Sequence, residues 1–116
     1  MLVKTLDLDV VPGKERKKIW LSQNDENFAL VFKLYARYGE LTIEPGTTVK
    51  INGKTSDGTA YTADASIVGK TVTVEGDGAM TAVPGDGLFE IELTHGDKRI
   101  STENFIIRIE SPARST

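Results

Sequence analysis

The sequence predicts an all-β domain, specifically an immunoglobulin-like antiparallel β-sandwich of about seven to nine short strands. Three observations support this. Apolar and polar residues alternate in short runs along most of the chain, which is the period of a half-buried strand. Turn signals that contain glycine or proline separate these runs, and no run has the spacing of an amphipathic helix. The chain has no cysteine, so the predicted sandwich contains no disulfide.

The first third of the chain is expected to contain three strands. Apolar residues alternate over 2–8, and this strand should end before Pro12-Gly13. A short strand follows at 19–21. If Ile19 and Leu21 face the core, Trp20 between them points outward. The clearest alternation covers 28–34, so Phe28, Leu30, Phe32 and Leu34 are predicted to line one buried face.

The middle of the chain is expected to contain strands at 49–51, 61–67 and 72–74. Tight turns are predicted between them because their glycines tolerate positive φ; they lie at Asn52-Gly53, Asp57-Gly58 and Gly69-Lys70. Residues 76–87 contain too many glycines for a strand and are expected to form a crossover loop with one helical turn at 79–82.

Two strands should complete the fold. Apolar residues alternate over 89–93, and His95-Gly96-Asp97 should turn the chain into a last strand over 100–109. The irregular spacing between Thr102 and Phe105 predicts a bulge at Glu103-Asn104. Residues 1–110 are therefore predicted to form one domain, since 116 residues supply a single core. Residues 111–116 are polar and read as the start of a linker.

The composition argues against several classes of partner. The net charge is −3, which does not favour nucleic acid as the main partner. No apolar run approaches the length of about 18 residues that crosses a membrane, and the N-terminus lacks the pattern of a signal peptide. The chain is therefore expected to bind neither nucleic acid nor membrane.

No arrangement of residues predicts catalysis or a cofactor. The chain has one histidine, His95, and no cysteine, so a zinc site and a serine–histidine–aspartate triad both lack components. Two Gly-Lys-Thr triplets, at 53–55 and 69–71, lack the preceding glycine of a phosphate-binding loop and are expected to be turns. Glu90 and Glu92 lie on the polar side of one strand, and Asp7 and Asp9 lack the clustered loop oxygens of a calcium site.

Charge is unevenly distributed, and this asymmetry leads to the candidate partner-binding site. Lys14, Arg16, Lys17 and Lys18 form a basic cluster broken only by Glu15, and Trp20 follows directly. Between Lys70 and Lys98 no lysine or arginine occurs, whereas acidic residues accumulate. Both segments could be solvated faces or complementary docking surfaces that steer association. Trp20 could be covered by a neighbouring loop or could anchor a partner, as tryptophan often does in interfaces.

Several runs in order resemble the N-terminal domain of phage baseplate upper proteins. The resemblance covers about Val3 to Glu110, and it is carried by the runs 6–13, 18–23, 32–35, 46–48, 57–61, 80–82, 89–91 and 100–105. It implies an immunoglobulin-like domain that attaches a fibre protein to the distal tail hub of the virion, assembled in the cytoplasm of the bacterial host. It supplies no catalytic motif.

In that family a helical segment and a trimerising region normally follow, and they contact the receptor-binding protein. The chain ends at Thr116, so those regions are expected to be absent from it, and an oligomer is left open for the full-length protein. Two alternatives remain open. One is attachment of a fibre to the phage head. The other is a carbohydrate-binding β-sandwich that contacts the host cell wall through Trp20, Tyr38 and Tyr61.

Overall fold

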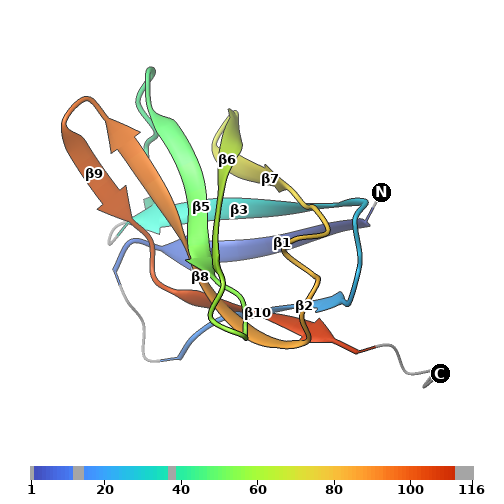
Figure 1. The fold of residues 1–116 in the computed structure, drawn as a ribbon. Coiled ribbons are helices and arrows are strands. Elements are labelled where there is room, and N and C mark those ends of the chain that lie inside the picture. The colour runs from blue at the N-terminus through green and yellow to red at the C-terminus, as the bar shows by residue number, and fades with distance from the viewer. Residues whose placement is uncertain (1, 12–14, 37–38, 112–116) are drawn as a thin grey trace.

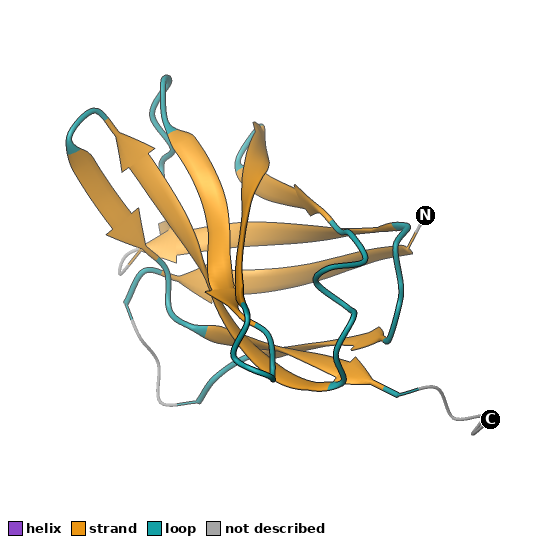
Figure 2. Cartoon of the chain, in the orientation of Figure 1, coloured by secondary structure: helices purple, strands orange, loops and turns teal. Residues whose placement is uncertain are grey.

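The computed structural model describes residues 2–11, 15–36 and 39–111, and the described chain consists of strands and loops (Figures 1 and 2). The all-β prediction is confirmed. The described residues form ten strands: β1 (Leu2–Asp9), β2 (Lys18–Ser22), β3 (Phe28–Ala36), β4 (Gly39–Glu40), β5 (Thr48–Lys54), β6 (Ala60–Val68), β7 (Thr71–Glu75), β8 (Gly85–His95), β9 (Lys98–Ser101) and β10 (Phe105–Glu110).

The strands form one hydrogen-bonded path in the order β1-β3-β7-β6-β5-β8-β10-β2, with β4 beside β3 and β9 beside β8. Strand β6 joins two halves, because its first residues pair with β5 and its last residues pair with β7. In Figure 1 the half that contains β1 and β3 crosses the half that contains β5 and β8. The path ends at two edge strands, β1 and β2. The immunoglobulin-like arrangement itself stays a prediction.

The two outermost strand pairs are parallel, which the predicted antiparallel sandwich did not include. β1 runs parallel to β3, and β2 runs parallel to β10. The reason is the path of the chain. It leaves β1, crosses to the other half to form β2, and returns to form β3, so β3 enters its half in the same direction as β1. Parallel neighbours require such a crossover, whereas a tight hairpin gives antiparallel ones.

The core lies between the two halves and is centred on aromatic side chains. Phe32 of β3 and Phe105 of β10 are fully buried, and their ring centroids are 5.1 Å apart. Phe89 of β8 lies 6.3 Å from Phe105 on the other side. Phe28, Leu30 and Leu34 are buried as well, so the predicted inward face of this strand is confirmed.

The turn predicted at Asn52-Gly53 is wrong. Both residues lie inside β5 and pair with β6 on one side and β8 on the other. Glycine is required at position 53 because there is no space for a side chain. A Cβ atom would overlap the carbonyl oxygen of Leu88 and the ring of Phe89. The chain turns instead at Asp57-Gly58, where Gly58 has a φ of +88°, as predicted. The turn at Gly69-Lys70 is also confirmed, with a φ of +61° at Gly69.

The glycine-rich segment 76–87 is only partly a loop, because β8 begins at Gly85. Gly87 pairs within the sheet, and a Cβ atom there would lie 2.7 Å from the Phe89 ring. Residues 78–81 form a turn in place of the predicted helical turn. This turn places Met80 in the core, with 1% of it exposed.

The predicted last strand is divided in two. β9 ends at Ser101 and β10 begins at Phe105, so residues 102–104 leave the sheet where a bulge was expected. The hydroxyl of Thr102 accepts a hydrogen bond from the Ile91 backbone N–H at 3.0 Å, and the Thr102 backbone N–H donates to the Ile91 carbonyl at 2.9 Å. These bonds turn Glu103 inward, where 6% of it is exposed.

Candidate docking surface

Trp20 lies on the outward side of β2, as the alternation predicted. Ile19 and Leu21 on either side are buried, whereas 53% of Trp20 is exposed. The Lys18 Nζ atom lies 5.6 Å from the centroid of the indole ring, which is a cation–π geometry. Trp20 is therefore an exposed aromatic residue on an edge strand, and within the described residues no loop covers it.

Lys17 has a structural role that the sequence did not predict. Its Nζ atom lies 3.1 Å from the buried carboxylate of Glu103 and donates to the Asp7 carbonyl at 2.7 Å. The same carboxylate accepts the backbone N–H of Asp9 at 2.8 Å, and the Glu103 N–H donates to the Asp9 carbonyl at 2.7 Å. These bonds tie the end of β1 to the segments that precede β2 and β10. Lys17 is thus engaged within the fold.

Lys18 joins a network of charges beside Trp20. Arg108 of β10 is the register partner of Trp20, and Asp86 of β8 is the partner of Arg108. The Asp86 carboxylate lies 3.3 Å from Arg108 Nη1 and 3.8 Å from Lys18 Nζ. Exposed pairs of this kind add little to stability. They do hold two basic side chains next to the indole ring.

Apolar side chains continue this surface across the sheet. Ile106 of β10 lies between Lys18 and Leu88 in register, and 38% of Leu88 is exposed. A hollow of about 440 Å³ adjoins Leu88 and is lined by Lys54, Glu90 and Asn104 among others. Exposed aromatic and aliphatic groups with a charged rim are typical of protein interfaces. We call this surface the outer patch; it consists of Lys18, Trp20, Asp86, Leu88, Ile106 and Arg108.

The outer patch agrees only in part with the predicted basic cluster. Arg16 is exposed and precedes Lys18 by two residues, Lys17 is bound to Glu103, and Lys14 lies outside the described residues. One residue of the acidic stretch, Asp86, lies within the patch. Sequence reasoning missed the contributions of β8 and β10, since no local pattern shows that these strands lie beside β2.

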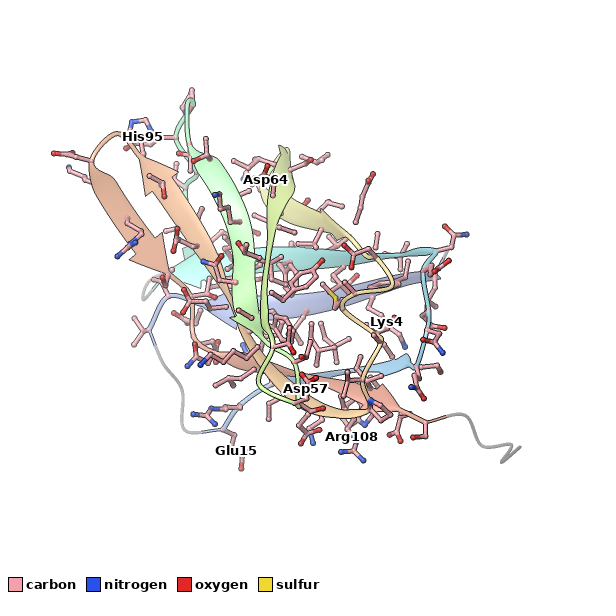
Figure 3. All side chains as sticks on the ribbon, in the orientation of Figure 1. Lys4, Glu15, Asp57, Asp64, His95 and Arg108 are labelled. Carbon is pink, nitrogen blue, oxygen red and sulfur yellow. The ribbon has the colours of Figure 1, made fainter. Side chains whose placement is uncertain are left out.

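The other candidate residues form no reactive arrangement among the described residues. Glu90 accepts a hydrogen bond from the Ser101 hydroxyl, and Glu92 accepts one from the Asn52 amide. His95 lies at the β8–β9 turn, far from Arg108 in Figure 3, with its Nε2 atom 3.3 Å from a carboxylate oxygen of Glu44. No group of three histidine or acidic side chains in the described chain is placed to hold a metal ion.

Tyr61 is the residue whose ionisation the fold alters most clearly. Its hydroxyl donates to Asp77 at 3.1 Å and its ring packs edge-on against Phe89. Burial, and then the Asp77 carboxylate, raise the pKa of Tyr61 to about 12, because both disfavour the phenolate. The pKa in the folded state thus lies above the unfolded value of about 10. The resulting stability is complete below pH about 10 and is lost as the pH rises toward 12.

An absorbance titration of the phenolate tests this expectation. The wild-type domain should show an ionisation step near pH 12, and the Tyr61→Phe variant should lack it. If all the tyrosines of the wild type were ionised by pH about 11, the environment described for Tyr61 would be wrong.

The described fold and the outer patch define an all-β module with an exposed apolar and charged surface. Over residues 2–11, 15–36 and 39–111, no helix is long and apolar enough to span a membrane. The chain matches no model of a protein family and no curated protein.

Solved structures do resemble it. The N-terminal domain of phage TP901-1 ORF48 has a TM-score of 0.73 and 14% identity over 95% of this chain and 99% of that chain. CopC from Methylosinus trichosporium OB3b has a TM-score of 0.56 and 10% identity over 88% of this chain and 91% of that chain. At these identities the likeness establishes a shared fold.

Proposed function

We propose that this domain is a non-catalytic structural module of a phage particle, and that it attaches a fibre protein of the tail baseplate to the hub of the virion. The observation that carries the proposal is the fold. Its likeness to a phage N-terminal domain extends over almost the whole of both chains. The sequence resemblance to baseplate upper proteins rests on different grounds and supports the same role.

The proposal includes the finer features that the resemblance implies. They are an immunoglobulin-like arrangement of the strands, a domain over residues 1–110 and a linker that starts at 111. The domain would be assembled in the host cytoplasm and reside in the virion. Its partners would be other phage structural proteins, with the receptor-binding protein contacted through regions beyond this chain.

The outer patch supports docking onto a protein. Trp20 offers a large exposed ring, and tryptophan is enriched among the residues that dominate binding energy. Lys18 within the patch and the exposed Arg16 that precedes it in the chain supply positive charge, which steers encounter with an acidic partner. The hollow beside Leu88 provides room for a side chain of the partner.

No observation favours a carbohydrate-binding site. Tyr61 is partly buried and packs against Phe89 at the core, whereas Trp20 points away from the core, so these two aromatics do not share a platform. Tyr38 lies outside the described residues. Attachment to the phage head and attachment to the tail are distinguished by which phage protein binds this domain, a head protein or a tail protein.

Binding to individually purified tail hub proteins of the same phage tests the proposal, with the domain immobilised and measured at low and high salt. Trp20→Ala should speed dissociation and cost about 2 kcal/mol or more of binding free energy. Arg16→Glu and Lys18→Glu should mainly slow association and change its salt dependence. Lys17→Glu is unsuitable, because it would place a second carboxylate against Glu103.

Lys70→Glu is the matched control. Lys70 is highly exposed at the β6–β7 turn, away from the outer patch, and the substitution changes the charge by the same amount. It should bind like the wild type. If the domain bound only a head protein, its attachment point would be the phage head. If it bound none of these proteins, the structural role would be refuted.

A further inference from the structure

We infer that the partner docks by adding an extended segment of its own chain beside β2, so that the sheet continues into the partner. This inference rests on the proposed function, because it specifies how the partner binds at the outer patch. An exposed sheet edge accepts such a segment through main-chain hydrogen bonds, and neighbouring side chains give specificity.

The hydrogen-bond pattern shows which backbone groups of β2 are free. The Lys17 carbonyl accepts from Ile106 N–H at 2.8 Å, and Gln23 N–H donates to the Glu110 carbonyl at 2.8 Å. In a parallel pair, alternate residues direct their backbone groups to the same neighbour. Ile19 and Leu21 therefore face β10, while Lys18 and Trp20 direct their N–H and C=O groups away from the sheet.

The outward groups of β2 are left available for a partner. β2 is the last strand of the path, so within the described residues no strand lies on the side to which Lys18 and Trp20 direct their backbone N–H and C=O groups. The next outward donor, Ser22 N–H, is bound by the Asp25 carboxylate at 3.0 Å, which ends the available edge. The free segment thus offers two donors and two acceptors over three residues.

The other edges carry features that oppose strand addition. β1 has Lys4 on its core-facing side, opposite Leu30, and an inward charge on an edge strand is a known barrier to pairing. β9 carries Lys98 and Arg99, both exposed. On β2 the core-facing residues are apolar and buried, and Lys18 is drawn over the Trp20 ring and toward Asp86. Of the edge strands β1, β2 and β9, β2 is therefore the least protected against pairing.

Charge defines the segment that would fit. Glu103 neutralises Lys17, and Arg108 lies between Asp86 and Glu110, 3.3 Å and 4.0 Å from their carboxylates. Lys18 shares the Asp86 carboxylate with Arg108, at 3.8 Å from its Nζ atom. Within the described residues, Arg16 is therefore the basic residue near the start of β2 that has no ion pair. The partner segment is therefore an extended strand that places a carboxylate side chain beside Arg16 and an apolar side chain beside Trp20.

A pair of variants at Lys18 separates the backbone from the side chain. Lys18→Ala and Lys18→Pro both remove the charge, but only proline removes the outward N–H. Proline is tolerated at the first residue of a strand and where the N–H faces solvent, so thermal melting should show both variants folded. Lys18→Pro should bind the tail hub protein about tenfold more weakly than Lys18→Ala, or worse. Equal affinities would overturn strand addition.

Amide hydrogen exchange of the wild type, followed residue by residue by NMR, gives a test that needs no variant. In the free domain the amides of Lys18 and Trp20 should exchange fast, while those of Ile19 and Leu21 are protected by β10. In the complex with the hub protein, Lys18 and Trp20 should become protected as well. Fast exchange at both residues in a formed complex would refute the inference and leave the proposed function intact.

The remaining outcomes are also decisive. Protection of Lys18 and Trp20 that rises with the concentration of the domain alone, together with a dimer in sedimentation, would make the occupant a second copy and overturn the assignment to a partner. Absence of binding to every tail protein, with the fold intact, would refute the proposed function and this inference together.

Discussion

Phe32→Ala is expected to lower the free energy of unfolding by about 3–5 kcal/mol. Phe32 is fully buried, and it contacts both halves of the sheet. Its neighbours in register on β1 and β7 are Leu6 and Val72, while its ring faces Phe105 of the opposite half at 5.1 Å. Truncation would remove this bridge and leave a cavity that the surrounding strands cannot close, because each is held in register by its own hydrogen bonds.

Urea titration of the purified variant measures this loss. Glu92→Gln is the control, because the amide can still accept the hydrogen bond from Asn52 and the residue lies on the polar side of β8; its effect should stay within about 0.5 kcal/mol. A loss below about 1 kcal/mol for Phe32→Ala would mean that this residue does not bridge the two halves.

Gly53→Val is expected to cost about 3 kcal/mol, although valine is favoured in strands. The added Cβ atom would overlap the Leu88 carbonyl oxygen and the Phe89 ring. Phe89 cannot move aside freely, since Phe105 and Tyr61 pack against its two sides. The strand would have to shift away from β8, and the hydrogen bonds between them would weaken.

Lys50→Val on the same strand is the matched control for Gly53→Val. Lys50 is exposed and lies between the same two strands, β6 and β8, so the change there should stay within about 0.5 kcal/mol. Comparable midpoints of urea unfolding for the two variants would show that Gly53 has space around it. That result would refute the crowding described around Gly53.

The sequence alone determined which face is buried in those strands where apolar and polar residues alternate clearly. Over 28–34 every second residue is large and apolar, and turning this strand over would expose four such side chains to water, so its buried face could be predicted with no knowledge of its neighbours. The same reasoning placed Trp20 outward, because Ile19 and Leu21 on either side of it require burial. Local alternation is a sufficient signal where the removal of apolar side chains from water decides which face is buried.

The tertiary structure decided what depends on partners distant in the chain. Asn52-Gly53 has the composition of a turn, yet Gly53 lies in a strand because the Phe89 ring occupies the space of its Cβ atom. Glu103 is buried because Lys17 and the Asp9 backbone reach it.

The outer patch was decided in the same way. It combines side chains of β2, β8 and β10, and only the register of these strands brings Asp86 and Arg108 to Trp20. A glycine can indicate either backbone freedom or lack of space, and a charge can lie on a solvated face or in a buried pair. Only the neighbouring atoms in the folded chain separate these cases. They set the space, the hydrogen-bond partners and the access to solvent of a residue, and the free energy of each possible arrangement depends on these.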